Sequence, residues 1–187
     1  MKVLITGGAG YVGSHTAKEL ARAGHEVFAY DNLSRGNRWA VKWGPLLEGD
    51  LLDEETLTKA LISHRIEAVL HFAALAYVGE SVERPSDYFR NNVQGSLALL
   101  RAMKAAQVNT LIFSSTCAVF GNPIVLPVSE ESPKNPLSPY GESKRIIEQI
   151  LRWSGECDGF AGGAPLFTPL QAIRRAKSGS AIHRKLT

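Results

Sequence analysis

A tyrosine and a lysine lie four positions apart late in the sequence, at Tyr140 and Lys144. On a helix this spacing places both side chains on one face, about one turn apart. A phenol has a pKa of about 10, so a base that works at neutral pH needs a pKa about three units lower, or roughly 4 kcal/mol of phenolate stabilisation. The Lys144 ammonium can contribute to it, and the Thr116 hydroxyl can share a substrate proton with Tyr140. The sequence therefore predicts proton transfer by Thr116, Tyr140 and Lys144.

Three glycines at a spacing of three residues, Gly7, Gly10 and Gly13, lie between an expected strand and an expected helix. Side chains there would keep a dinucleotide pyrophosphate away from the N–H groups at the helix N-terminus, whereas glycine leaves the approach open. The motif predicts a dinucleotide site, with Tyr11 and Val12 as further cofactor-binding positions. The alternative is that the glycines only form a tight turn and let the helix pack closely. Without a cofactor site, a Tyr-x-x-x-Lys spacing is a chance arrangement.

An acidic residue, Asp31, ends the second expected strand, eighteen residues after Gly13. A carboxylate at this place accepts hydrogen bonds from the adenosine ribose hydroxyls and repels a 2′-phosphate, which favours NAD over NADP. Arg35 and Arg38 could relieve that repulsion. We favour the interpretation that both are solvated loop arginines, since neither directly follows the acid.

Two more strand ends carry cofactor candidates. Asp50 and Leu51 follow the third expected strand and are predicted to contact adenine, with helix capping as the alternative for Asp50. His71 ends the fourth strand and is expected to be a packed, hydrogen-bonded residue and not a catalyst. The residues after it suit a close cofactor approach: Phe72, Ala73 and Ala74.

The elements that must position these residues alternate between short apolar runs and segments of helical spacing. Strands are expected at residues 2–6, 26–30, 46–48, 68–72 and 110–113, and helices at 11–23, 53–64, 86–106 and 140–153. This alternation predicts an α/β fold, a Rossmann-like doubly wound parallel sheet with helices on both faces. The corresponding domain covers residues 1–155.

The charge of the 187-residue chain argues against a nucleic-acid-binding surface. Its formal net charge is +3. Residues 1–155 are neutral, with 16 basic and 16 acidic groups, and residues 156–187 carry five basic and two acidic groups, so 5 − 2 = +3. A positive surface over the fold is therefore not expected. Residues 156–187 are predicted to be an irregular or disordered tail, with a basic interaction tail as the alternative.

The cysteines and the apolar runs indicate the compartment. Cys117 and Cys157 form no CxxC pair and have no neighbouring histidine pair, so neither a disulfide framework nor a metal site is predicted. Cys117 is expected to be a small buried hydrophobe. No apolar run approaches the roughly 18 residues of a membrane span. We expect a cytoplasmic protein without membrane contact.

Five segments of the sequence resemble the extended short-chain dehydrogenase/reductase family, most closely its UDP-glucose 4-epimerases. They are Thr6-Gly7-Gly8-Ala9-Gly10-Tyr11-Val12-Gly13, Asp31-Asn32-Leu33-Ser34, His71-Phe72-Ala73-Ala74, Ser114-Ser115-Thr116 and Ser138-Pro139-Tyr140-Gly141-Glu142-Ser143-Lys144. The resemblance implies that NAD is the cofactor and that Asn32, Asn91 and Ser114 also line its site. It further implies a UDP-sugar substrate and a homodimer of the full-length protein, formed through the helices at 86–106 and 140–153.

The same resemblance implies a mechanism. Tyr140 removes the proton of the sugar 4-hydroxyl while NAD takes the hydride from C4, and the hydride returns to the other face of the 4-keto sugar. Other family enzymes, such as a UDP-glucuronate 4-epimerase or decarboxylase, and a non-catalytic NAD-binding module are the alternatives. Ala76 stands where epimerases often have lysine, and Cys117-Ala118 stands where the related dehydratases have Asp-Glu.

The resemblance ends near residue 155. We expect the residues beyond it to reflect a reading-frame change or the end of a fragment, so that the fold is truncated before its substrate domain. The 187-residue chain is then expected to show little or no turnover.

Overall fold

Six parallel strands form one sheet in the computed structural model, which describes residues 1–124, 126–158 and 161–162. The strands are β1 (Lys2–Thr6), β2 (Glu26–Asp31), β3 (Leu46–Glu48), β4 (Ala68–His71), β5 (Thr110–Phe113) and β6 (Ala161–Gly162). Their order across the sheet is β3-β2-β1-β4-β5-β6. The chain builds outward from β1 to β3 and then returns to place β4 on the other side of β1. Ligands of such sheets bind at the carboxyl ends of the strands beside this reversal.

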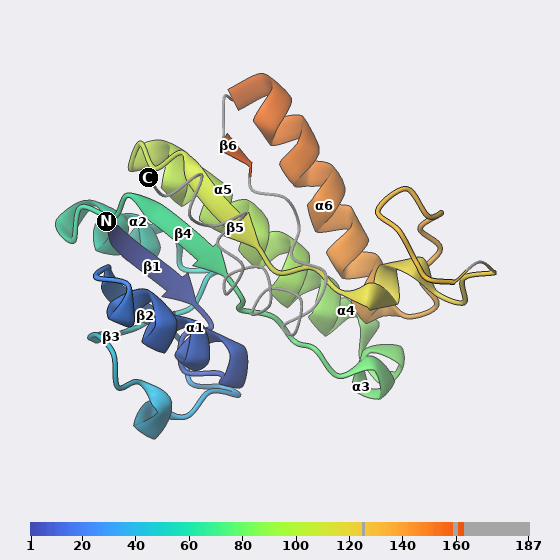
Figure 1. Cartoon of the computed structure of the whole chain (residues 1–187), viewed down its shortest axis with the longest axis horizontal. Coiled ribbons are helices and arrows are strands. Elements are labelled where there is room, and N and C mark those ends of the chain that lie inside the picture. The colour runs from blue at the N-terminus through green and yellow to red at the C-terminus, as the bar shows by residue number, and fades with distance from the viewer. Residues whose placement is uncertain (125, 159–160, 163–187) are drawn as a thin grey trace.

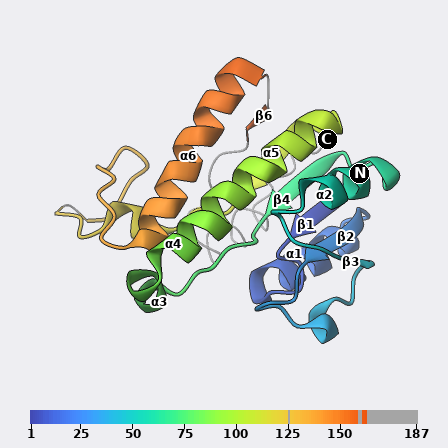
Figure 2. The same cartoon turned by 180° about the vertical axis from the view of Figure 1, so that it is seen from behind.

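Helices cover both faces of the sheet, and Figures 1 and 2 show the two sides. Helix α1 (Tyr11–Arg22) packs on β1 and β2 from one side. Helices α2 (Glu54–Ser63) and α5 (Gly95–Ala105) contact each other on the opposite side. The remaining elements are η1 (Arg38–Ala40), α3 (Val78–Glu83), α4 (Pro85–Tyr88), the π-helical η2 (Phe89–Gln94), η3 (Cys117–Phe120) and α6 (Pro139–Asp158). The predicted doubly wound α/β fold is confirmed.

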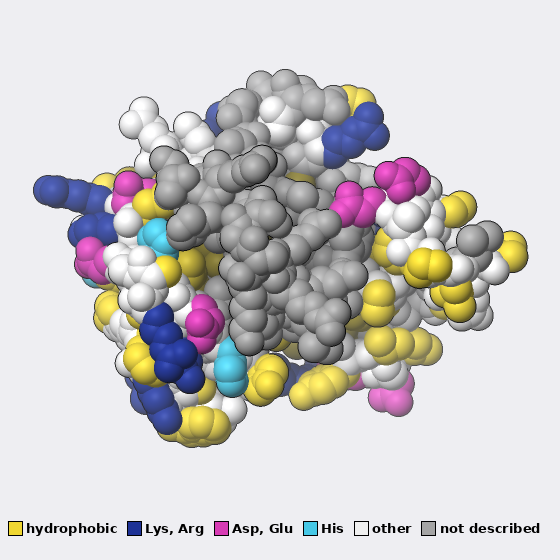
Figure 3. Space-filling model, viewed as in Figure 1, with side chains coloured by type: hydrophobic (Ala, Val, Ile, Leu, Met, Phe, Trp, Pro, Cys, Tyr) yellow, Lys and Arg dark blue, Asp and Glu magenta, His cyan; other side chains and the backbone are white. Residues whose placement is uncertain are grey.

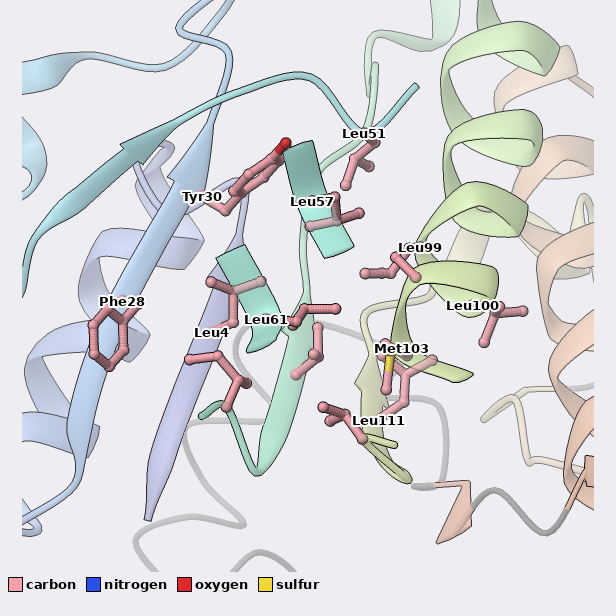
Figure 4. Packing of buried hydrophobic residues seen from close by; sticks show 14 residues of the cluster. Leu4, Phe28, Tyr30, Leu51, Leu57, Leu61, Leu99, Leu100, Met103 and Leu111 are labelled. Carbon is pink, nitrogen blue, oxygen red and sulfur yellow. The ribbon is translucent and has the colours of Figure 1, made fainter. Parts of the chain in front are cut away.

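The alternation of side chains along each strand divides the core between the two faces. Val3 and Ile5 pack on the α1 side with Leu20. The residue between them, Leu4, points to the other side. There it joins the larger cluster, which includes Leu57, Leu61, Leu99, Met103 and Leu111 (Figure 4). The two clusters fix the strands against the helices and so hold the carboxyl ends of the strands in place.

Several elements differ from the sequence-based expectation. The prediction of a single α-helix over residues 86–106 is wrong, because the π-helical η2 lies between α4 and α5. Helix α3 was not predicted. Helix α6 continues to Asp158, five residues past the expected end at Trp153. A strand was not expected near Ala161, yet β6 pairs with β5, which requires only backbone groups. Residues 159–160 and 163–187 of the predicted tail lie outside the described residues.

Exposed apolar side chains gather on the loop between η3 and α6, at the right of Figure 3. Ile124, Leu126 and Leu137 of this loop are all exposed.

Among the described helices, none combines the length and the apolar character that crossing a membrane requires.

The turn between β1 and α1 brings backbone segments too close for side chains. Gly7 has a φ of +70°, and a Cβ there would lie 2.7 Å from the backbone nitrogen of Ala73. A Cβ at Gly13 would lie 2.2 Å from the carbonyl oxygen of Gly7. The Gly7 N–H donates to the carbonyl of Tyr30 over 2.9 Å, which ties the turn to β2. Glycine is therefore required at both positions for the packing of the turn itself.

Substitution of Gly13 by alanine (Gly13→Ala) is expected to lower the free energy of unfolding by about 2 kcal/mol, because the added Cβ must displace the Gly7 carbonyl. Gly79→Ala is the matched control, since a Cβ at Gly79 in α3 meets no atom within 4 Å. This control is expected to be neutral or stabilising by up to about 1 kcal/mol. Urea unfolding measures both, and equal stability of Gly13→Ala and the unaltered chain would contradict the packing described.

Candidate functional site

A cavity lies at the carboxyl ends of β1, β2 and β4, beside the reversal of the strand order. Ten of the predicted cofactor-binding residues line it: Gly7, Gly10, Asp31, Asn32, Asp50, Leu51, Phe72, Ala73, Ala74 and Asn91. Six predicted residues are not among its walls: Tyr11, Val12, Gly13, Ser114, Tyr140 and Lys144. The lining also includes residues that were not predicted as cofactor contacts: Tyr30, Ser34, Arg35, Gly36, Gly49 and Leu75.

The N-terminus of α1 opens onto this cavity. Gly10 is the N-cap residue, and no side chain caps the helix there. The first N–H groups of a helix have no partner within the helix. Together with the helix dipole they stabilise an anion, above all a phosphate. Tyr11 and Val12 follow the cap within this first turn, which explains their place in the motif without a side-chain role at the cavity.

The buried carboxylate of Asp31 joins the glycine turn to the loop after β2. Its Oδ2 accepts from the Ala9 N–H at 3.0 Å, and its Oδ1 accepts from the Leu33 N–H at 2.8 Å. The residue is only 7% exposed. A Cβ at Gly36 would lie 2.8 Å from Oδ1, so a side chain at that position would contact the carboxylate. A glycine five residues after the acid, Gly36, is a sequence signal for this close approach.

The alternative role of Asp50 as a helix cap is wrong. Asp53 caps α2, because its side chain accepts from the Thr56 N–H at 3.0 Å. Asp50 instead accepts from Asn32 Nδ2 at 2.8 Å, and its carbonyl accepts from the Tyr30 hydroxyl at 3.0 Å. These bonds connect the ends of β2 and β3 along one wall of the cavity.

Tyr140, near the start of α6, is half-buried, and its phenol is hydrogen-bonded to the side chain of Thr116. The ring of Tyr88 meets the Tyr140 ring edge-on, with 6.4 Å between centroids. Burial raises the pKa of Tyr140 above its usual value, and the Thr116 hydrogen bond acts in the opposite direction. The structure thus brings the Thr116 and Tyr140 side chains together, and their role in proton transfer stays a prediction. Cys117, expected to be buried, is instead exposed, because it begins the short η3 turn and not a core element.

Lys144 is buried one helical turn beyond Tyr140, with 3% of its surface exposed. Its Nζ donates to the Ser114 carbonyl at 2.9 Å and lies 4.6 Å from the centroid of the Phe113 ring. Burial lowers the pKa of Lys144 to about 7, whereas the negative charge of Glu148 acts in the opposite direction. The ammonium is therefore anchored at the carboxyl end of β5 and changes its protonation near neutral pH.

His71 is the packed strand residue that its position indicated. Its Nδ1 lies 2.7 Å from the Thr6 hydroxyl, and its Nε2 lies 2.9 Å from the Ser96 hydroxyl. Burial, and then the charge of Lys144, lower its pKa to about 3. The ring is neutral at neutral pH, and both nitrogens are engaged inside the fold.

Two adjacent asparagines of η2 connect the cavity to α6. Asn91 lines the cavity and donates from Nδ2 to Asn92 Oδ1 at 2.9 Å. The buried Asn92 accepts from the Leu75 N–H at 2.8 Å and donates from Nδ2 to the Leu75 carbonyl and to Ser143 Oγ, both at 3.0 Å. Asn92 was not predicted, although two asparagines inside a helical segment are an unfavourable choice that signals a special role. π-helical turns are frequent at functional sites.

The two loop arginines are solvent-exposed, as expected, and each also has an ion-pair partner. Arg35 Nη2 lies 2.5 Å from Glu80 Oε1, and Arg38 pairs with Glu48. The partners come from α3 and from β3, and sequence spacing alone does not indicate such contacts.

Known proteins share both the sequence and the fold. The chain matches the model of the NAD dependent epimerase/dehydratase family over residues 3–164. A UDP-glucose 4-epimerase of Rhizobium leguminosarum bv. trifolii is 49% identical over 149 residues, which are 80% of this chain and 46% of that protein. UDP-arabinose 4-epimerase 1 of Arabidopsis thaliana is 44% identical over 80% of this chain and 38% of its own length.

Solved structures of proteins named UDP-glucose 4-epimerase are also similar to this chain in fold. The crystal structure of a UDP-glucose 4-epimerase from Brucella ovis in complex with NAD has a TM-score of 0.86 at 47% identity, and the match covers 87% of this chain and 50% of that one. The enzyme of that name from Thermotoga maritima, solved with UDP-glucose, has a TM-score of 0.84 at 36% identity, over 87% of this chain and 54% of its own. The chain spans about half the length of the relatives it matches. By the extent of these matches, it belongs to the NAD-dependent epimerase/dehydratase family.

Proposed function

We propose that this chain is the NAD-binding and proton-transferring part of a nucleotide-sugar 4-epimerase that interconverts UDP-glucose and UDP-galactose. One observation carries the proposal: the glycine turn, the buried Asp31 and the anchored Lys144 all lie at the carboxyl ends of strands in one parallel sheet. Residues 1–155 are the domain to which we assign this role.

The residues of the cavity fit NAD. The absence of side chains at Gly7 and Gly10 leaves the N-terminus of α1 open to a pyrophosphate. Asp31 would accept from the ribose hydroxyls, and Asn32 and Asp50 would hold the adenosine. The remaining proposed contacts belong to Leu51, Phe72, Ala73, Ala74, Asn91 and Ser114.

The proton-transfer residues act on the sugar. When bound, NAD supplies the hydride acceptor and donor for C4 of the sugar. Tyr140 takes the proton of the 4-hydroxyl and returns it, and Thr116 keeps the phenol in place through their hydrogen bond. Because burial raises the pKa of Tyr140, its phenolate needs a positive charge nearby. The Lys144 ammonium is placed one helical turn away to supply it.

The sugar is the part of the proposal that relatives define least. Similar proteins are named for UDP-glucose at 49% identity and for UDP-arabinose at 44% identity. The activity test must therefore compare several UDP-sugars, UDP-glucuronate included.

Titration with NAD is expected to raise the melting temperature, because a ligand that binds only the native state stabilises it, by about 2.7 kcal/mol at 100 times its Kd. Gly10→Leu is expected to abolish this shift, since position 10 lines the cavity and a Cβ there meets only the Gly7 carbonyl oxygen, at 3.2 Å. Gly79→Leu, in the open space beside α3, is the matched control that keeps the shift. An unaltered chain whose melting temperature ignores NAD would refute the cofactor assignment.

Tyr140→Phe is expected to lower kcat at least about a hundredfold, because the ring still packs but cannot exchange a proton. The chain spans about half the length of its relatives. The assay therefore uses residues 1–155 fused to the complementary half of the Rhizobium relative, with chromatography of UDP-galactose and UDP-glucose. Tyr77→Phe, at an exposed tyrosine, is the control and should leave kcat unchanged. A fusion that binds NAD yet converts no UDP-sugar would support a non-catalytic NAD-binding module instead.

The pKa of Lys144 predicts a pH-dependent stability. The pKa of Lys144 is about 7 in the folded chain and 10.5 at its usual value. Between these two pH values the Lys144 amine carries a proton in the unfolded chain and lacks it in the folded chain. The free energy of unfolding should therefore rise with pH in this window, by up to about 1.4 kcal/mol per pH unit, and this contribution should vanish below pH 7. Urea unfolding between pH 7.5 and 9.5 measures the slope, which Lys144→Met should flatten. Identical slopes for the two proteins would contradict the assignment.

A further inference from the structure

One cation borders the cavity. Arg35 is the only lysine or arginine among the described residues that line it, and it follows Asp31 by four residues. The neighbouring Gly36 packs so closely on Asp31 that a Cβ there would lie 2.8 Å from the carboxylate. An arginine at this place is near the group that would meet the adenosine ribose, and guanidinium groups bind phosphates through paired hydrogen bonds.

Glu80 of α3 engages this arginine. Arg35 Nη2 lies 2.5 Å from Glu80 Oε1, and the guanidinium also lies 5.4 Å from the centroid of the Tyr77 ring. Both contacts draw Arg35 toward α3. Glu80 lines the space beside the cavity together with Arg35, Asn32 and Asp50.

The position of Glu80 is itself fixed. Its Oε2 lies 2.9 Å from the Tyr88 hydroxyl, and the Tyr77 carbonyl lies 2.7 Å from it, so the two oxygens share the single hydrogen of this phenol. Arg84 approaches Glu80 Oε1 at 3.9 Å, although Arg84 pairs more closely with Asp87, at 2.6 Å. The hydrogen bond from Tyr88, and then the one from Arg35, lower the pKa of Glu80, which keeps its charge available for the ion pair.

We propose that Glu80 is a specificity-determining residue, which holds Arg35 away from an adenosine 2′-phosphate and thereby keeps this site selective for NAD over NADP. The inference rests on the proposed function as an NAD-binding domain. Asp31 alone repels a 2′-phosphate, but an unpaired guanidinium four residues away would offset that repulsion. By pairing with Arg35, Glu80 prevents the guanidinium from neutralising a 2′-phosphate. The selectivity for NAD therefore depends on Glu80 of α3 as well as on Asp31 of β2.

The test compares the Kd values of NAD and NADP, measured by thermal-shift titration of the full chain. Glu80→Gln keeps an oxygen that accepts from Tyr88 but loses the charge that engages Arg35. It is expected to strengthen NADP binding relative to NAD by about tenfold. Glu83→Gln removes the same charge from an exposed position of the same helix and should leave the ratio within about twofold.

The arginine supplies a second, independent measurement. Arg35→Gln in the Glu80→Gln background should cancel the gain in NADP binding, whereas Arg35→Gln alone should leave the NAD to NADP ratio unchanged, because Glu80 already engages this arginine. An unchanged ratio in Glu80→Gln, or equal gains for both nucleotides, overturns the inference while NAD binding remains. So does a loss of NADP binding in Arg35→Gln alone. Failure of the unaltered chain to bind NAD overturns the proposed function as well.

Discussion

Direct contact between backbone segments is the constraint on which the rest of the site depends. With no side chain at Gly7 or Gly13, the turn after β1 lies against the backbone that follows β4 and against the first turn of α1. Only in that position does the Ala9 N–H reach the carboxylate of Asp31, at 3.0 Å. The helix N-terminus, the acid and the ends of these strands thus form one continuous wall of the cavity.

A buried ionisable side chain lies at each end of the site, and the two have different hydrogen-bond partners. At the end of β2, two backbone N–H groups solvate the buried carboxylate of Asp31. At the end of β5, Lys144 donates to the Ser114 carbonyl and lies over the Phe113 ring. Burial lowers its pKa to about 7. The two N–H groups offset the loss of hydration of the Asp31 carboxylate, whereas the surroundings of Lys144 favour its neutral form. His71 ends β4, which lies between β2 and β5 in the sheet, and it is neutral at neutral pH.

Much of the fold could be predicted from the sequence because strands and helices here bury one face each. Periodicity located β1 to β5, and the glycine spacing with Asp31 located the cavity wall. Periodicity does not register an extra residue within a helix, so η2 was missed. It also does not register backbone pairing, as in β6, or ion pairs between distant residues such as Arg35 and Glu80. The site contacts that could not be predicted are those that depend on how loops pack against one another.

The π-helical segment η2 limits how this part of the chain can change in length. One residue in an α-helix corresponds to a rotation of about 100°. Asn91 of η2 faces the cavity, whereas Leu99 and Met103 of α5 face the core under the sheet. Removal of a single residue would restore a regular helix but turn one of these faces away from its partners. A change of one residue in the length of this stretch would therefore disturb the packing of one face or of the other, even with every side chain kept.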